Sequence, residues 1–187
     1  MDFDSYLKQT GLFNEEELTR ISSSFDERTI PKGTVIEGVN QFSERMIFIE
    51  SGLLRTFFYR DGKDITHFFF EENYFLAPVS RIFFNREERY IWEAIEECQV
   101  SSIRWEEFQA LEEQYPKLTR LLLGFAVQML DIFSQKLNLL QFQSASERYA
   151  LFQEMYPNLN NRISLGATAS FLGITQQTLS VARSKKN

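Results

Sequence analysis

Polar side chains with base-reading chemistry cluster between Ile163 and Lys186, near the C-terminal end of the chain. The spacing there predicts two short helices that meet at a sharp turn, because a small Ala169 allows close approach and Gly173 can take positive φ. Thr175 is placed to cap the second helix. The outward face of that helix then carries side chains that can reach base edges in a DNA major groove: Gln176, Gln177, Ser180, Val181 and Ser184.

These residue types suit two kinds of DNA contact. A glutamine amide can pair with N6 and N7 of adenine, and a valine methyl can contact thymine, whereas arginine and lysine bind phosphate and fix register. The predicted DNA-binding set is Thr175, Gln176, Gln177, Ser180, Val181, Arg183, Lys185, Lys186 and Arg162. The pattern alone is also compatible with a second interpretation, in which the two helices only complete a hydrophobic core and bind no DNA.

The distribution of charge favours the DNA interpretation. Residues 144–187 contain five cations and two anions, a balance of +3, whereas residues 1–143 contain 15 cations and 24 anions, a balance of −9. An acidic body with a basic tail is expected if only the tail approaches phosphate.

Other kinds of chemistry lack the residues they need. His67 is the only histidine and Cys98 the only cysteine, which excludes an intrachain disulfide, a catalytic triad and a multi-histidine or four-thiolate metal site. We therefore predict no catalytic residue, no metal ligand, no cofactor and no enzyme activity. The acidic N-terminus and the lack of a long uncharged apolar window predict a cytoplasmic protein without a membrane partner.

The elements that precede the helix pair form two groups. Residues 1–24 predict helix, with Asn14 as a cap. From Arg28 to Trp105, short apolar runs are broken by PKG, ESG and RDGK, which predicts roughly eight strands in a closed or double-sheet architecture, with a hairpin turn at Asp61-Gly62.

A long helix is predicted after this β region. A short helix ends at Tyr115-Pro116, and residues 116–142 then run without a second helix breaker. Apolar residues at heptad-like spacing predict a dimer interface, which would present two reading helices to a palindromic operator. The predicted interface residues are Leu118, Leu122, Phe125, Met129, Ile132 and Leu139. Ser144 and Glu147 then have the spacing of a capping box, and the helix that they open should stop at Pro157.

Several phrases resemble the Crp/Fnr family of bacterial transcription regulators: IPKGTVI, MIFIESGLLRTFF, DGKDIT, EAIEECQV, SASERYALFQEMYP and ISLGATASFLGITQQTLSVAR. The resemblance covers nearly the whole chain and implies an α+β fold. An N-terminal double-stranded β-helix (jelly-roll, cyclic-nucleotide-binding-like) barrel would span 1–115, a long dimerisation helix 116–142 and a small helix-turn-helix domain 143–187. The chain resembles short members of the family without the wing hairpin.

The resemblance also locates an effector pocket. Cyclic-nucleotide-binding members hold the phosphate with a Gly-Glu turn, an arginine and a helix N-terminus. In this sequence the turn falls near Leu76, Ala77 and Pro78, and the arginine position falls on Glu88. A carboxylate repels phosphate, so we expect that cyclic AMP does not bind. The residues expected around an unknown small-molecule effector are His67, Phe69, Phe75, Leu76, Ala77, Glu88 and Arg89.

The sequence therefore predicts a homodimeric, sequence-specific DNA-binding regulator of the Crp/Fnr type, with double-stranded DNA as partner and RNA polymerase as a further partner that the resemblance allows. The alternative is a small-molecule sensor or interaction module whose helix-turn-helix no longer binds DNA.

Overall fold

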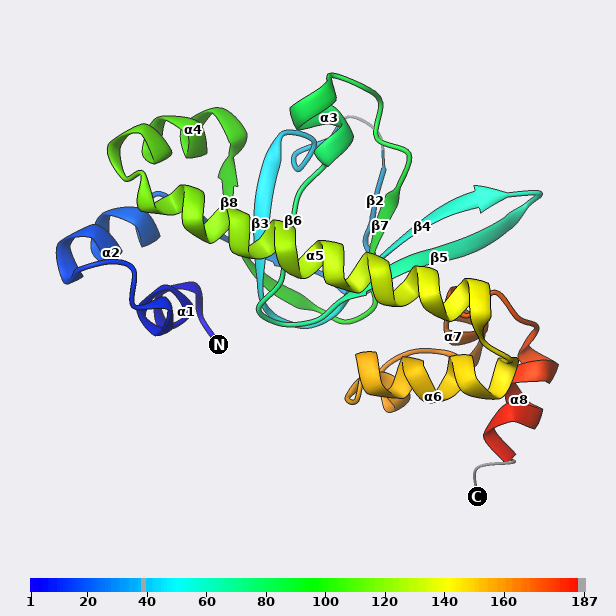
Figure 1. Cartoon of the computed structure of the whole chain (residues 1–187). Coiled ribbons are helices and arrows are strands. Elements are labelled where there is room, and N and C mark those ends of the chain that lie inside the picture. Colours follow the sequence, from blue (N-terminus) through cyan, green and yellow to red (C-terminus); the bar gives the residue numbers. More distant parts are fainter. Residues whose placement is uncertain (38–39, 185–187) are drawn as a thin grey trace. The chain divides into compact units, whose positions relative to one another are not determined.

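The computed structural model describes residues 1–37 and 40–184 (Figure 1). The helices are α1 (Phe3–Thr10), α2 (Glu15–Ser22), α3 (Val79–Phe84), α4 (Trp105–Gln114), α5 (Lys117–Phe142), α6 (Ala145–Met155), the 3-10 helix η1 (Leu159–Asn161), α7 (Leu165–Phe171) and α8 (Gln176–Ser184). The strands are β1 (Asp26–Ile30), β2 (Val35–Ile36), β3 (Arg45–Ser51), β4 (Leu54–Arg60), β5 (Lys63–Phe70), β6 (Phe75–Leu76), β7 (Ile91–Ala94) and β8 (Cys98–Arg104). None of the helices described has the length and apolar character needed to cross a membrane.

Contacts divide the chain into two compact units. The first unit comprises Met1–Thr56 and Phe69–Phe125, and the second comprises Phe57–Phe68 and Ala126–Asn187. This division differs from the predicted boundaries 1–115, 116–142 and 143–187 in two ways. The long helix α5 contributes to both units, and the turn end of the β4–β5 hairpin groups with the C-terminal helices, because its side chains pack on α5 and α7.

The strands form two four-stranded sheets, as the punctuated apolar runs predicted. Their orders are β1-β8-β3-β6 and β2-β7-β4-β5. The pairs β1–β8, β2–β7, β3–β6 and β3–β8 are all antiparallel. Asp61 and Gly62 form the β4–β5 turn with φ of 51° and 73°, and two successive positive φ values are typical of a two-residue hairpin. The predicted hairpin is therefore confirmed.

Gly52 shows why the ESG segment needs a glycine between β3 and β4. Its φ is 98°, and a Cβ at this position would lie 2.4 Å from the carbonyl oxygen of Glu97. Both the backbone conformation and the close approach exclude a side chain.

An aromatic core holds the first unit together. Phe3 of α1 lies 4.3 Å from Phe25 and 5.2 Å from Phe48 of β3, measured between ring centroids. Phe75 of β6 extends the cluster, 5.0 Å from Phe48 and 4.1 Å from Phe125 of α5. Helices α1, α2 and α4 thus cover β3, β6 and β8, and the predicted N-terminal helix lies on the β region.

The helix boundaries follow from local chemistry that the sequence displays. The predicted Asn14 cap of α2 is a complete capping box with Glu17, and Ser144 forms the same box with Glu147 at the start of α6. Helix α4 ends before Pro116, and α6 ends two residues before Pro157. Helix α3 and the 3-10 helix η1 were not predicted.

Helix α5 carries two apolar rows, and the predicted interface is the one that faces the chain itself. Leu118 and Leu139 are completely buried, while Leu122 and Phe125 pack against the core of the first unit. Met129 and Ile132 are half-buried. This inner row cannot offer Leu118 and Leu139 to a second copy, so the prediction is wrong for those two residues.

The second row of α5 faces solvent in the isolated chain. Its apolar members are Leu123, Val127, Leu130 and Leu137, with exposed fractions of 62, 57, 67 and 56%. Their alternating spacing of four and three residues, with Ser134 in the remaining position, is that of a coiled-coil seam. We call these four residues the outer row.

Candidate functional sites

The helix pair α7–α8 forms around the predicted turn. Gly173 takes a φ of 64°, its N–H donates to the carbonyl of Ser170, and the N–H of Ile174 donates to the carbonyl of Ala169 over 3.0 Å. Thr175 then caps α8, because its hydroxyl accepts the N–H of Thr178 over 3.1 Å. The predicted turn and cap are both confirmed.

Helix α8 buries one side and exposes the other. Leu179 and Ala182 have exposed fractions of 0 and 4%, and they form the apolar underside of the helix. Six residues of the predicted DNA-binding set are exposed: Thr175, Gln176, Gln177, Ser180, Val181 and Arg183. At 3.6 residues per turn, Gln177, Ser180 and Val181 lie on the side opposite Leu179 and Ala182. Gln176 and Arg183 lie nearer the buried side of the helix, beside α7 and Tyr149.

The two glutamines differ in what they contact. The side chain of Gln176 packs against Gly166 of α7, the first helix of the pair. If Gly166 carried a Cβ, that atom would lie 3.1 Å from the amide nitrogen of Gln176. Gln177 is exposed on the side of α8 opposite Leu179 and makes no side-chain hydrogen bond among the described residues.

The basic residues of this region differ in their exposure and in their contacts. The guanidinium of Arg183 lies 5.8 Å from the centre of the Tyr149 ring, which supports it while it remains at the surface. Arg162 is half-buried. Lys185 and Lys186 lie outside the described residues, so their predicted phosphate contacts stay predictions.

Arg148 has a structural role that the sequence did not reveal. Its three guanidinium nitrogens each donate over 3.0 Å to a different carbonyl: those of Leu140 at the end of α5, Gln143 in the connection and Leu172 at the end of α7. Carbonyls at helix ends have no partner within the helix, and a guanidinium can satisfy several at once. Arg148 therefore fixes α7 to the end of α5.

A buried lysine joins the β4–β5 hairpin to the helices of the second unit. Lys136 of α5 is 8% exposed, and its ammonium lies 4.7 Å from the ring centre of Phe68 and 4.2 Å from that of Phe171. It also donates to the carbonyl of His67. We call these four residues the Lys136 cluster.

The Lys136 cluster perturbs the titration of its two ionisable members. Burial lowers the pKa of Lys136 to about 7, although the two ring faces and the carbonyl favour the ammonium form. Burial, and secondarily the charge of Lys136, lowers the pKa of His67 to about 4, so this imidazole is neutral near pH 7. Ser170 of α7 adds a second link, because it accepts the N–H of Thr66 and donates to the carbonyl of Asp64.

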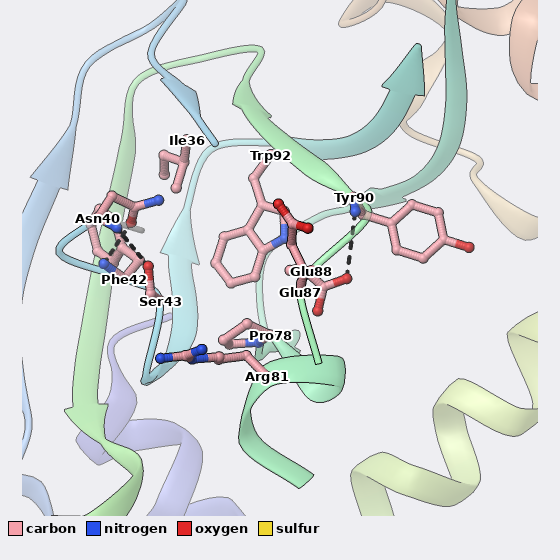
Figure 2. A pocket seen from close by; sticks show the side chains of 10 residues that line it. All are labelled: Ile36, Asn40, Phe42, Ser43, Pro78, Arg81, Glu87, Glu88, Tyr90 and Trp92. Carbon is pink, nitrogen blue, oxygen red and sulfur yellow. Dashed lines mark hydrogen bonds between the residues drawn. The ribbon is translucent and has the colours of Figure 1, made fainter. Parts of the chain in front are cut away.

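A cavity of about 320 Å³ lies in the first unit, a size within the range of small-molecule sites (Figure 2). Residues from the β2–β3 region, the α3 region and β7 line it: Ile36, Asn40, Phe42, Ser43, Pro78, Arg81, Glu87, Glu88, Tyr90 and Trp92. The phenol ring of Tyr90 points away from the other labelled side chains in Figure 2. We call this space the Trp92 cavity.

Glu88 is held by backbone donors at the edge of the Trp92 cavity. Its carboxylate accepts the N–H groups of Ser80 over 3.2 Å, Arg89 over 3.1 Å and Tyr90 over 3.4 Å. Ser80 lies in the first turn of α3, where backbone N–H groups have no helical partner. The chain's own anion therefore uses a donor that an external phosphate would need.

The predicted effector residues are only partly brought together. Glu88 lines the Trp92 cavity, but the other six do not. Phe69, Phe75 and Leu76 are buried in packing, and His67 belongs to the Lys136 cluster of the other unit. Ala77 and Arg89 are neighbours of lining residues rather than lining residues themselves. No local motif in the sequence marks Ile36, Asn40, Phe42, Ser43 or Trp92 as cavity-lining residues.

Solved structures share this fold. A CooA variant from Carboxydothermus hydrogenoformans matches with a TM-score of 0.70 and 18% identity, covering 89% of this chain and 78% of that one. FixK2 from Bradyrhizobium japonicum gives 0.71 and 19%, covering 86% and 83%. A Crp/Fnr-family regulator from Eubacterium rectale gives 0.71 and 17%, covering 94% and 84%. The predicted resemblance to Crp/Fnr regulators is thus confirmed for the fold.

Neither protein-family models nor curated proteins give a match to this chain.

We expect replacement of Arg148 by methionine to destabilise the second unit by about 2 to 4 kcal/mol, because three helix-end and connection carbonyls lose a charged donor. Urea unfolding followed by circular dichroism measures the change. Arg60→Met is the matched control, since Arg60 is an exposed side chain of the same unit. A loss for Arg148→Met no larger than that of the control would contradict the assigned role.

The lowered pKa of Lys136 predicts a pH dependence of stability. Between about pH 7 and pH 10.5 the unfolded chain binds a proton that the folded chain has released, so the free energy of unfolding should rise with pH in this window. The slope is at most about 1.4 kcal/mol per pH unit. Lys136→Met should flatten this dependence, whereas Lys63→Met, an exposed lysine of the same hairpin, should retain it. Parallel curves for all three proteins would show that Lys136 does not titrate in this range.

Proposed function

We propose that the chain is a homodimeric, sequence-specific DNA-binding transcription regulator of the Crp/Fnr type. The observation that carries this proposal is helix α8, which buries Leu179 and Ala182 against its neighbours and exposes a row of hydrogen-bonding side chains beside Arg183. A helix that is capped at Thr175 and anchored by its underside can enter a major groove with its N-terminal residues leading. The fold shared with Crp/Fnr regulators supports this use of the helix pair.

The chemistry of the exposed face favours A·T pairs. Gln177 can pair with adenine and Val181, 51% exposed, offers methyl groups to thymine. On the described part of α8, Arg183 is the one arginine, and it lies in the last turn on the ring of Tyr149. Arginine is the usual reader of guanine, so we infer an operator whose half-sites are rich in A·T pairs.

The outer row of α5 supports dimerisation. Leu123, Val127, Leu130 and Leu137 are all more than half exposed, and a second copy of the helix would cover them with the same residues in a two-fold arrangement. This seam replaces the inner row as the proposed dimer interface. A two-fold dimer presents two α8 helices, which suits a palindromic operator.

The Trp92 cavity is the proposed effector pocket, and it is unsuited to a cyclic nucleotide. Glu88 uses the Ser80 N–H of α3, Pro78 has no N–H to donate, and Glu87 places a second carboxylate in the lining. A phosphate here would face two negative charges. We infer that cyclic AMP is not the effector.

Selection of bound sequences from a random double-stranded DNA pool, at low and moderate salt, tests the proposed function. We expect a palindromic consensus with half-sites about one helical turn, roughly 10 bp, apart. Recovery of no consensus, with no binding even at low salt, would overturn the proposal and favour the alternative of a sensor that does not bind DNA.

On the selected sequence, Gln177→Ala should weaken binding by about 1 to 3 kcal/mol and should change binding to random DNA little, because its amide reads a base rather than a phosphate. Fluorescence anisotropy with labelled duplexes measures both affinities. Gln109→Ala, an exposed glutamine of α4, is the control and should bind both duplexes like the parent chain. Equal losses on selected and random DNA would disprove base reading by Gln177.

Leu130→Glu should shift the chain from dimer to monomer, because it places two carboxylates against each other at the centre of the proposed seam. Sedimentation velocity over a range of concentrations should show at least about tenfold weaker association. Gln128→Glu adds the same charge to an exposed position of α5 outside the outer row and should remain dimeric. A dimer of unchanged stability in Leu130→Glu would place the interface elsewhere.

A further inference from the structure

The Trp92 cavity has an apolar interior. Ile36, Phe42 and Trp92 have exposed fractions of 9, 3 and 4%, and Pro78 is also buried. In Figure 2, Phe42 lies on one side of the indole of Trp92, and Glu87 and Glu88 lie on the other. The walls therefore suit a ligand with an apolar body, and an aromatic face attracts a cation more strongly than it attracts a neutral group.

Trp92 also carries a polar group without a partner. Its side chain is almost completely buried, yet among the described residues its indole N–H donates no hydrogen bond. The indole nitrogen is not among the buried unpaired side-chain atoms of the described residues, so it keeps accessible surface at which an acceptor can meet it. A ligand in the cavity that carries an oxygen acceptor would satisfy it.

The charges around the cavity are unbalanced toward the negative. Arg81, the one lysine or arginine among the lining residues described, lies 3.4 Å from the carboxylate of Glu44, which offsets its charge. Glu88 is occupied by three backbone donors. Glu87 is exposed at the edge and, within the described residues, makes neither an ion pair nor a hydrogen bond. A cation would match Glu87, whereas an anion would be repelled.

We propose that the Trp92 cavity binds a small organic cation, an alkyl- or arylammonium compound with a hydrogen-bond acceptor near its charge. The ammonium lies between the face of Trp92 and the carboxylate of Glu87, and the apolar body contacts Ile36, Phe42 and Pro78. The claim that this cation is the effector rests on the proposed regulatory function. The claim that it binds the cavity concerns the first unit alone.

The test uses choline and acetylcholine as cationic probes, because both carry an oxygen acceptor near the quaternary nitrogen. Neohexanol, in which carbon replaces the choline nitrogen, is the neutral comparison, and cyclic AMP is the anionic one. The chain contains two tryptophans, so Trp105→Phe leaves Trp92 as the only indole, and its fluorescence reports occupancy directly. Titration calorimetry on the unsubstituted chain gives the affinities. We expect saturable binding of at least one cation, with neohexanol at least about tenfold weaker than choline where choline binds.

Two substitutions that each replace a glutamate by the neutral glutamine locate the site. Glu87→Gln keeps the size of the side chain and should weaken cation binding by about threefold to tenfold, without affecting neohexanol. Glu97→Gln removes a charge from an exposed residue of the same unit that does not line the cavity, and it should leave all affinities unchanged.

The proposal is overturned if neither cation saturates at millimolar concentration, if neohexanol binds as well as choline, or if cyclic AMP binds more tightly than both cations. Because binding is measured without DNA, its outcome is separate from that of the operator selection. A chain that binds the cation but no operator would retain the site and lose the proposed regulatory function. The opposite result would retain the regulator and lose the ligand class.

Discussion

The guanidinium of Arg148 joins three carbonyls that would otherwise lack partners, and the geometry of the C-terminal helices follows from this contact. Leu140 belongs to the last turn of α5, and Leu172 directly precedes the glycine at which α7 turns into α8. The direction in which α8 leaves is therefore tied, within the second unit, to the end of the long helix. The exposed face of α8 thus depends on a half-buried cation whose guanidinium is held by backbone carbonyls.

Local chemistry made much of the fold predictable from the sequence. Capping side chains such as Asn14, Ser144 and Thr175 act on N–H groups two or three residues away, and the Asp61-Gly62 and Gly173 turns require φ values that few residue types adopt. Signals of this kind need no knowledge of distant contacts. The starts of α2, α6 and α8 and the β4–β5 and α7–α8 turns follow from them.

Which face of α5 is buried could not be predicted in the same way. Both apolar rows repeat at about 3.5 residues, so periodicity alone fits either, and the sequence analysis chose the row of Leu118 and Leu139. That row also contains Lys136, whose charge would ordinarily argue for exposure. The rings of Phe68 and Phe171, from segments about 70 and 35 residues away in the chain, accommodate this lysine, and such distant partners leave no local signal. For the same reason only Glu88 of the predicted effector residues lines the Trp92 cavity.

Hydrogen bonds within the chain also change what the charge balance implies. Residues 144–187 carry a balance of +3, but Arg148 is committed to carbonyls inside the second unit, and Glu147 is committed to the capping box of α6. Among the described residues of this segment, Arg183 is exposed and Arg162 is half-buried. A weakly basic surface of this kind gives little non-specific attraction to phosphate. In the proposed function, discrimination between DNA sequences therefore rests chiefly on the hydrogen-bonding face of α8, and charge serves to orient the helix.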